Sequence, residues 1–260
     1  MRIVSWNIHH AIGGDRRTDL VRIARVLAEV DADIVALQEV DGADRAHPES
    51  QARELARALG MAVVEAPLLL AGQSHWGNAI LSRHPIGPWH RRRFARSGKE
   101  PRGLLFAEIE DDGGTIWRIA TTHLDLMPHH RTAQLRETAA ILAAEPPLPT
   151  VLVGDLNAWR RRSRALAALG AAVDLLDAPP TFPSRWPWLR LDRIAIRGCR
   201  LVAAVRVVDS AAARAASDHL PLLADLVAPQ PAAARSRAMP SSTSSEPLQP
   251  ISESPTGIPL

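Results

Sequence analysis

Several residue types are scarce in this 260-residue chain, and each scarcity excludes a class of protein. The single cysteine, Cys199, cannot build a disulfide framework or a zinc site made of thiolates, which fits a reducing compartment such as the cytoplasm. No apolar run approaches the roughly 20 residues that a membrane helix needs. Residues 1–4 lead directly into strand-like sequence, so we expect no signal peptide and a soluble, cytoplasmic protein.

The basic charge of the sequence comes almost entirely from arginine, since Lys99 is the only lysine. The pI is about 10.2, although the formal net charge is only +3. Enrichment in arginine and alanine also follows from GC-rich coding, so it is weak evidence for nucleic-acid binding. Two basic clusters, at residues 90–99 and 160–164, are interpreted as solvated loops or, alternatively, as a rim that faces phosphate.

The composition changes near Ala228, and this change divides the chain. Residues 229–260 are rich in proline, serine, alanine and threonine and contain few large apolar side chains. Such a segment buries too little apolar surface to offset the entropy of ordering it. The sequence therefore predicts one folded catalytic domain over residues 1–228 and a disordered tail over residues 229–260.

Strand-like and helix-like segments follow one another within the predicted domain. Strands are predicted at residues 3–8, 34–37, 78–82, 104–109, 116–122, 151–153, 191–196, 202–208 and 220–226. Helices are predicted at residues 20–30 after Thr18 as N-cap, at 49–59 before Gly60, at 131–144, and at 163–169 before Gly170. The order contains hairpins as well as helical crossovers, which favours an α/β domain with mixed or antiparallel sheets.

Acidic, amide or histidine residues lie at the ends of six of these short apolar strands. They are Asn7 and His9, Gln38 and Glu39, His123 and Asp125, Asp155 and Asn157, Asp192, and Asp218 with His219. Because an isolated buried carboxylate is costly, six such strand ends indicate one focus of negative charge that a cation neutralises. Oxygen ligands without thiolates suit Mg²⁺, Mn²⁺ or Ca²⁺. This inventory is typical of metal-assisted cleavage of a phosphoester.

The segments that carry these residues resemble, in order, the motifs of the endonuclease/exonuclease/phosphatase superfamily. They are Ser5-Trp6-Asn7-Ile8, Leu37-Gln38-Glu39-Val40, Thr122-His123-Leu124, Gly154-Asp155-Leu156-Asn157, Leu191-Asp192-Arg193-Ile194 and Ser217-Asp218-His219. Each motif alone is weakly specific, whereas six in this order over residues 3–226 are strongly so. The resemblance implies a four-layer α/β sandwich like that of deoxyribonuclease I. Two packed mixed or antiparallel sheets would be flanked by helices, with the site at one edge of both sheets.

The resemblance also implies roles for these residues around a bound Mg²⁺, for which Mn²⁺ is the expected substitute. Glu39 would be the principal metal ligand. Asn7 would touch the metal or the scissile phosphate, and Asp218 would lie near the metal. Asp155 would orient or deprotonate the attacking water, and Asn157 would hold a phosphoryl oxygen.

The remaining roles fall on two histidines and their neighbours. His219 would be the general base or a donor to the phosphate, with Asp192 fixing its tautomer. The sequence leaves open whether this histidine or the Gly-Asp-Leu-Asn aspartate is the base. His123 would bind phosphate or protonate the leaving oxygen. Asn78 and Arg102 would contact the substrate, although a solvated arginine is the alternative for Arg102.

Aromatic side chains outside the motifs have two or more interpretations each. His9 and His10 would either line the cleft or have a structural role. Trp159, Trp186 and Trp188 lie in loops between the motifs. There they would stack on a nucleic-acid base, enter lipid, or pack partly against the domain.

Three functions are compatible with the motifs. The favoured one is a Mg²⁺-dependent phosphoesterase that hydrolyses a phosphodiester or phosphomonoester, with the substrate undecided between a lipid-like head group and nucleic acid. A DNA or RNA nuclease is the second, although the absence of tyrosine and of long basic insertions weighs against a repair nuclease. A non-catalytic phosphate-binding module is the third and weakest, because no motif residue is replaced. We expect a monomer without an obligate protein partner.

Overall fold

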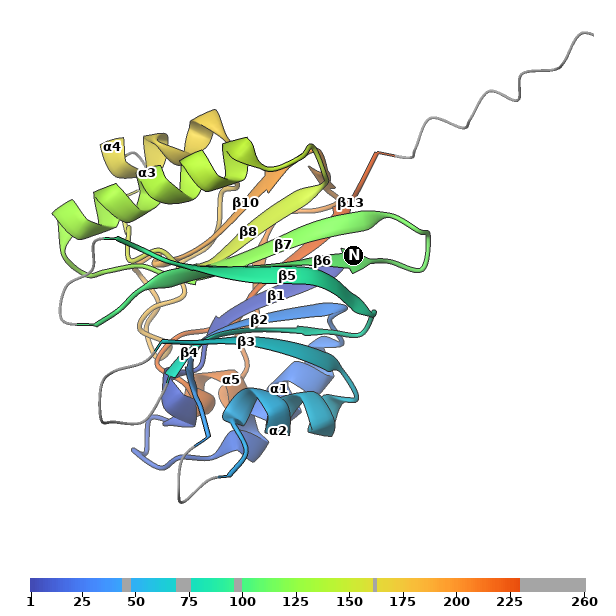
Figure 1. Ribbon diagram of the computed structural model, residues 1–260. Helices are drawn as coiled ribbons and strands as arrows, with labels where there is room; N and C mark the ends of the chain where they lie inside the picture. Colours follow the sequence, from blue (N-terminus) through green and yellow to red (C-terminus); the bar gives the residue numbers. More distant parts are fainter. Residues whose placement is uncertain (44–47, 69–75, 96–99, 161–162, 230–260) are drawn as a thin grey trace, which may run out of the picture. The chain divides into compact units, whose positions relative to one another are not determined.

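The computed structural model describes residues 1–43, 48–68, 76–95, 100–160 and 163–229 (Figure 1). One compact unit spans Met1–Pro229. The tail predicted over residues 229–260 lies outside the described residues beyond Pro229, and so do residues 96–99 and 161–162 of the two basic clusters. Within the described residues, no helix is both long and apolar enough to cross a membrane.

The described strands form two mixed sheets, one of seven strands and one of six. The first has the order β11 (Arg200–Leu201), β13 (Leu222–Val227), β1 (Arg2–Asn7), β2 (Ile34–Asp41), β4 (Trp76–Ser82), β3 (Ala62–Leu68), with β12 (Arg206–Val207) also on β13. The second has the order β5 (Ile86–Arg93), β6 (Gly103–Glu110), β7 (Ile116–His123), β8 (Thr150–Asp155), β10 (Asp192–Arg197), β9 (Asp174–Leu175). Two pairs, β1–β2 and β7–β8, are parallel.

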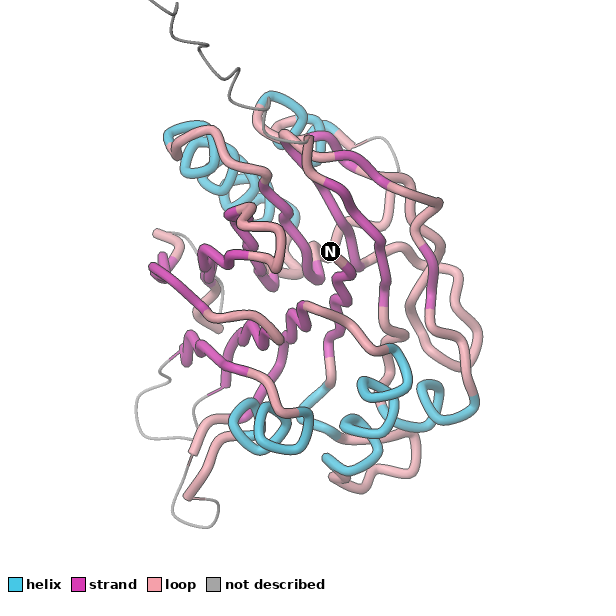
Figure 2. Tube along the Cα trace, turned by 90° about the vertical axis from the view of Figure 1, so that its right-hand side faces the viewer, coloured by secondary structure: helices cyan, strands magenta, loops and turns pink. Residues whose placement is uncertain are grey.

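Helices cover the outer face of each sheet, so the unit has the four layers that the sequence predicts (Figures 1 and 2). The first sheet carries α1 (Leu20–Val30), α2 (Gln51–Leu59) and α5 (Ala211–Ala216), and the second carries α3 (Pro128–Ala144) and α4 (Arg164–Ala167). Two short 3-10 helices, η1 (His9–Ala11) and η2 (Leu169–Ala171), complete the helical elements of the described residues. Three apolar clusters fill the three interfaces, and they include Ile23 with Leu55, Ile3 with Ile119, and Leu135 with Leu152.

The two parallel pairs bring the carboxyl ends of four strands to one edge of the sandwich. Asn7 is in register with Gln38 across β1–β2, and His123 with Asp155 across β7–β8. Antiparallel β10 starts at the same edge, because Asp192 lies opposite Asp155. Below this edge the buried amide of Gln38 donates to the hydroxyl oxygen of Thr121 in the other sheet at 2.9 Å. The polar strand ends of both sheets therefore meet at one place.

Helix boundaries differ from the sequence prediction at several ends, and α3 begins three residues before the predicted start at residue 131. The N-cap of α1 is Asp19 rather than Thr18, and its carboxylate accepts a hydrogen bond from the Arg22 backbone N–H. A carboxylate at this position also interacts favourably with the helix dipole, which a threonine does not. Gly60 ends α2 in the left-handed conformation as predicted. Gly170 does not end α4, because it lies within the 3-10 helix that follows.

The strand prediction is wrong at the sheet edges. The predicted strand at 202–208 is reduced to β12, because exposed Ala203 and Ala204 bring little apolar surface to a sheet. Strands β3 and β5 were not predicted, and residues 90–93 of β5 were interpreted as a loop. Both are edge strands, which tolerate Pro67, Pro88 and exposed arginines because one side of the backbone faces away from the sheet.

Gly154 is required for the close approach of β8 to β7. Its φ is +141°, and a Cβ atom there would lie 1.9 Å from the carbonyl oxygen of Thr122. We expect Gly154→Ala to lower the free energy of unfolding by at least about 2 kcal/mol, measured by urea denaturation. Gly170→Ala is the matched control, because nothing lies within 4 Å of its added Cβ. Equal midpoints for the two variants would contradict this account of Gly154.

Candidate active site

Asp155 lies at the centre of the predicted residues. Its Oδ2 accepts a hydrogen bond from Asn7 Nδ2 at 3.2 Å, and the same Asn7 nitrogen donates to Glu39 Oε1 at 3.0 Å. His123 Nε2 and His219 Nε2 lie 3.5 and 3.6 Å from that Asp155 oxygen. Residues from β1, from β7 and from the segment before β13 therefore surround the carboxylate at the end of β8, and Asn7 also links it to Glu39 of β2.

A bulge in β2 turns Glu39 toward this centre. The register of β2 against β4 shifts between Leu37 and Val40, and Glu39 has a φ of +53°. A bulge re-aims a side chain that regular pleating would direct elsewhere. The carboxylate of Glu39 is thereby held beside Asn7 and stays partly open to solvent, with 20% of its side chain exposed.

The Gly-Asp-Leu-Asn segment forms a turn that is fixed by its own side chains. Asp155 Oδ1 accepts a hydrogen bond from the Asn157 backbone N–H at 2.9 Å, and Asn157 has a φ of +50°. The Asn157 amide donates to the Leu124 carbonyl oxygen at 2.9 Å and lies 3.2 Å from His123 Nε2. Asparagine is among the few residues that adopt this backbone conformation readily, so the turn places its amide beside the histidine.

His219 is held in place from two sides. Its Nδ1 lies 2.8 Å from Asp192 Oδ2, the same oxygen that accepts a hydrogen bond from the Thr181 hydroxyl. Its carbonyl oxygen accepts a hydrogen bond from the Trp6 indole N–H at 2.9 Å, and the Phe182 ring packs 4.8 Å from its own. These contacts leave Nε2 directed at the centre of the site.

Arg102 is 5% exposed, so the alternative of a solvated arginine is wrong. Its Nη1 donates to His123 Nδ1 at 3.0 Å, and its Nη2 donates to Glu100 at 2.8 Å. The guanidinium also lies 5.0 Å from the centre of the Trp76 ring. Because Nδ1 accepts this hydrogen bond, the proton of a neutral His123 is on Nε2, the nitrogen that faces Asp155.

Two predicted residues lie at the margin of the cluster. Asn78 donates to the Gly103 carbonyl oxygen at 3.2 Å and lines a cavity of about 230 Å³ together with arginines of β5. The Asp218 side chain is 43% exposed, and its Oδ1 lies 3.8 Å from His9 Nδ1. Neither residue has a recorded contact with Asp155 or Glu39 among the described residues.

Comparison with known proteins identifies the family. The model of the Endonuclease/Exonuclease/phosphatase family matches residues 4–219. This chain belongs to that family. The uncharacterized protein YbhP of Escherichia coli K12 is 32% identical over 242 residues, which cover 86% of this chain and 95% of that protein.

Solved structures of the endonuclease/exonuclease/phosphatase family have the same four-layer fold, that of deoxyribonuclease I, as predicted. The endonuclease/exonuclease/phosphatase from Beutenbergia cavernae is 26% identical, with a TM-score of 0.70 over 87% of this chain and 71% of that one. The mannosyl-6-phosphatase Bt3783 of Bacteroides thetaiotaomicron is 19% identical, with a TM-score of 0.66 over 87% and 99% of the two chains. Members of this family hydrolyse phosphoester bonds and generally depend on a divalent metal.

The candidate site contains three deeply buried ionisable groups whose pKa values are moved by burial and by neighbouring charges. Burial raises the pKa of Asp155 to about 6, although the nearby His219 opposes the shift. Burial lowers the pKa of His219, but the Asp192 and Asp155 carboxylates outweigh it and raise that pKa to about 10. Burial and the Arg102 cation hold the pKa of His123 well below its usual value. At neutral pH the site therefore contains a charged His219 and a neutral His123.

The oxygen atoms at the centre fit the divalent metal that the family implies. Glu39 and Asp155 both accept from the Asn7 amide, and the Asn7 Oδ1, which accepts from the His9 backbone N–H at 3.0 Å, has a second lone pair. In the described part of the chain, no three His, Cys, Asp or Glu residues are grouped as a metal cage. Mg²⁺ is usually held by one or two carboxylates and keeps several waters, so Glu39 with a neighbouring oxygen suits it.

Three residues to which the sequence assigned no role, Trp76, Asp41 and Thr181, contact residues of the site. The Trp76 ring lies 5.9 Å from the His10 ring and 6.2 Å from the His123 ring. The Asp41 hydrogen bond raises the pKa of His10, whose Nε2 lies 3.6 Å from Glu39. Thr181 was missed because it lies in a loop without a motif. Trp76 lies two residues before the predicted strand at residues 78–82, and this proximity is the one signal in the sequence that could have found it.

The pairing of Asp192 with His219 makes stability depend on pH in a defined direction. The folded pKa of His219, about 10, lies above its ordinary value of 6.5. The pair therefore stabilises the fold fully below the ordinary value and loses this effect as the pH rises through about 10. In metal-free protein, Asp192→Asn should destabilise more at about pH 6 than at about pH 10, measured by urea denaturation.

Asp209→Asn is the control for this experiment, since Asp209 forms an ion pair with Arg214 at the surface. Its effect should be small at both pH values, because arginine remains charged throughout. A loss of stability in Asp192→Asn that does not change with pH would show that the carboxylate does not hold a charged histidine.

Proposed function

We propose that the protein is a Mg²⁺-dependent phosphoesterase that hydrolyses a phosphodiester or phosphomonoester by attack of an activated water. The observation that carries the proposal is the contact of Asn7 with both Glu39 and Asp155, which joins the strand ends of the two sheets. Two histidines with opposite protonation states lie within 3.6 Å of Asp155. Such a combination of acceptor, charged donor and neutral donor suits the attack of water on a phosphoester, because it can accept a proton and stabilise the charge that develops on the phosphoryl oxygens.

Glu39 and Asn7 are the residues proposed to hold the metal, with Asp218 at its outer side. A bound Mg²⁺ supplies charge neutralisation for the phosphoryl oxygens. The bulge at Glu39 and the Asn7 amide fix the carboxylate before any ligand enters. His10 Nε2 lies 3.6 Å from Glu39, and the Asp41 hydrogen bond raises the pKa of His10, which favours a positive charge beside the carboxylate.

Asp155 is proposed as the group that accepts the proton of the attacking water. Its pKa of about 6 lies close to neutral pH, so the carboxylate is ionised and still sufficiently basic. His219 is a poor candidate for the base, because Asp192 and Asp155 keep it protonated. We assign His219 the task of donating a charged hydrogen bond from Nε2 to a phosphoryl oxygen.

His123 and Asn157 are proposed to act on the remaining oxygens of the substrate. Arg102 occupies Nδ1 of His123, so Nε2 of the neutral ring carries the hydrogen and can donate a hydrogen bond to the leaving oxygen. The Asn157 amide lies beside this nitrogen and would hold a phosphoryl oxygen. Asn78 and the buried Arg102 would contribute to substrate binding from the same side.

A nuclease is the alternative function that one observation favours. Trp76 presents a partly exposed ring beside Arg102 and His123, and such a ring can stack on a nucleic-acid base. The substrate class is therefore tested directly. Turnover is measured at one Mg²⁺ concentration with a panel of substrates. The panel contains plasmid DNA, single-stranded RNA, phospholipids and sugar phosphates. Turnover of DNA or RNA alone would favour the nuclease.

Removal of the metal or of its proposed ligand should abolish hydrolysis. We expect EDTA to stop turnover of bis-p-nitrophenyl phosphate and Mg²⁺ to restore it. Glu39→Gln, which keeps the shape of the side chain and removes its charge, should lower kcat by at least about 100-fold. Turnover is measured by release of p-nitrophenol.

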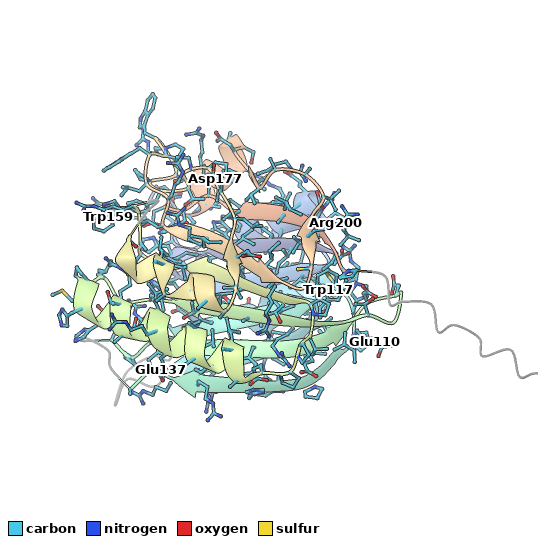
Figure 3. The ribbon with its side chains drawn as sticks, turned by 90° about the horizontal axis from the view of Figure 1, so that it is seen from above. Glu110, Trp117, Glu137, Trp159, Asp177 and Arg200 are labelled. Carbon is cyan, nitrogen blue, oxygen red and sulfur yellow. The ribbon has the colours of Figure 1, made fainter. Side chains whose placement is uncertain are left out.

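Glu110→Gln is the matched control, because Glu110 ends β6 at the opposite end of the strands from Trp159 of the site edge (Figure 3). It should leave kcat unchanged. Hydrolysis that survives EDTA, or a Glu39→Gln variant as active as the control, would refute the proposed metal site.

A further inference from the structure

Large apolar side chains are exposed around the edge of the sandwich where the site lies. Among the described residues nine such side chains are exposed, and five of them belong to three loops at this edge. These five are Leu126, Met127, Trp159, Trp186 and Trp188, with between 48% and 79% of each residue exposed. We refer to them as the apolar rim. Exposed apolar side chains are normal when scattered, whereas a group at one edge indicates an interaction surface.

Each of the three loops is an extension of the site itself. Leu126 and Met127 follow His123 at the end of β7, and Trp159 follows Asn157 after β8. Trp186 and Trp188 belong to the loop whose Phe182 packs on His219. In that loop the Ser184 backbone N–H donates to the Asp218 carbonyl oxygen at 2.7 Å. A ligand that binds the apolar rim would therefore lie next to the opening of the site.

Hydrogen bonds hold the apolar rim outward. Arg131 donates to the Leu126 carbonyl oxygen at 2.9 Å, and its guanidinium lies 5.6 Å from the centre of the Trp159 ring. Arg214 donates to the carbonyl oxygens of Ser184 and Arg185. The tryptophans are thus presented by loops whose backbone is already fixed, so docking costs little ordering entropy.

The exposed charge on the three loops of the apolar rim is positive. In the described residues 124–130, 156–160 and 181–190, the exposed charged side chains are Arg160 and Arg185, and no aspartate or glutamate is exposed. The acidic residue Asp125 of the first loop is buried. Arginines beside tryptophans are suited to an anionic surface with an apolar layer beneath it.

We propose that the apolar rim docks the open edge of the site onto an anionic lipid surface. Tryptophan prefers the boundary between head groups and acyl chains, and arginine is attracted to anionic head groups. A single-stranded nucleic acid would stack on the tryptophans but would leave Leu126 and Met127 without a partner. Docking at this edge indicates that the substrate is a phosphoester of a membrane lipid. This assignment of the substrate rests on the proposed phosphoesterase function.

Binding to vesicles tests the rim without any turnover. In EDTA, we expect the protein to sediment with vesicles of phosphatidylcholine and phosphatidylglycerol and to bind phosphatidylcholine alone more weakly. Trp186→Ala with Trp188→Ala should weaken partition by at least about tenfold. Arg185→Glu, which keeps the tryptophans, should weaken binding only to the anionic vesicles, by at least about fivefold.

Trp89→Ala is the matched control, because Trp89 is 47% exposed and lies in edge strand β5, outside the apolar rim. It should bind vesicles like the wild type. All variants should hydrolyse soluble bis-p-nitrophenyl phosphate at the wild-type rate, so failure of the phosphoesterase is recognised separately. Three results would overturn the proposal: no vesicle binding by the wild type, equal loss in the control, or rim variants that lose affinity for single-stranded DNA only.

Discussion

The carboxylate of Asp155 ends a strand of one sheet and accepts a hydrogen bond from Asn7, which ends a strand of the other. Asp155 is 2% exposed, and a buried carboxylate is tolerated only when charged or polar partners surround it. The partners of Asp155 are the rings of His123 and His219, the Asn157 backbone N–H and the Asn7 amide. The bulge at Glu39, the glycine before Asp155 and the parallel pairing of β7 with β8 all serve to bring these groups together.

Much of the site could be predicted because its residues lie at strand ends, where one polar cluster follows each apolar run. Contacts that depend on tertiary packing could not. The arginine at position 102 carries no local pattern that distinguishes a buried partner of His123 from a solvated side chain. Trp76 and Thr181 act through neighbours that are distant in sequence. Edge strand β5 lacks the alternating pattern, because its residues after Ile86 are exposed on both faces.

The same loops that complete the site also carry the apolar rim, so chemistry and docking are linked through short segments. In the loop after Asp155, Asn157 is buried in the site and Trp159 is exposed to solvent. The loop before β10 holds Phe182 against His219 and exposes Trp186. A lipid surface at the rim would present phosphoester groups to the open side of Glu39, whereas the buried histidines act from within. This arrangement joins the proposed substrate class to the geometry of the site.

The strand ends of both sheets are proposed to form one metal-dependent centre. The most direct test is a crystal structure of the protein with Mn²⁺, which replaces Mg²⁺ at oxygen sites and gives an anomalous signal. We expect an anomalous peak within coordination distance of a carboxylate oxygen of Glu39, roughly 2.0–2.1 Å as for Mg²⁺, and no such peak in Glu39→Gln. A peak bound elsewhere, or a peak that persists in the variant, would contradict it.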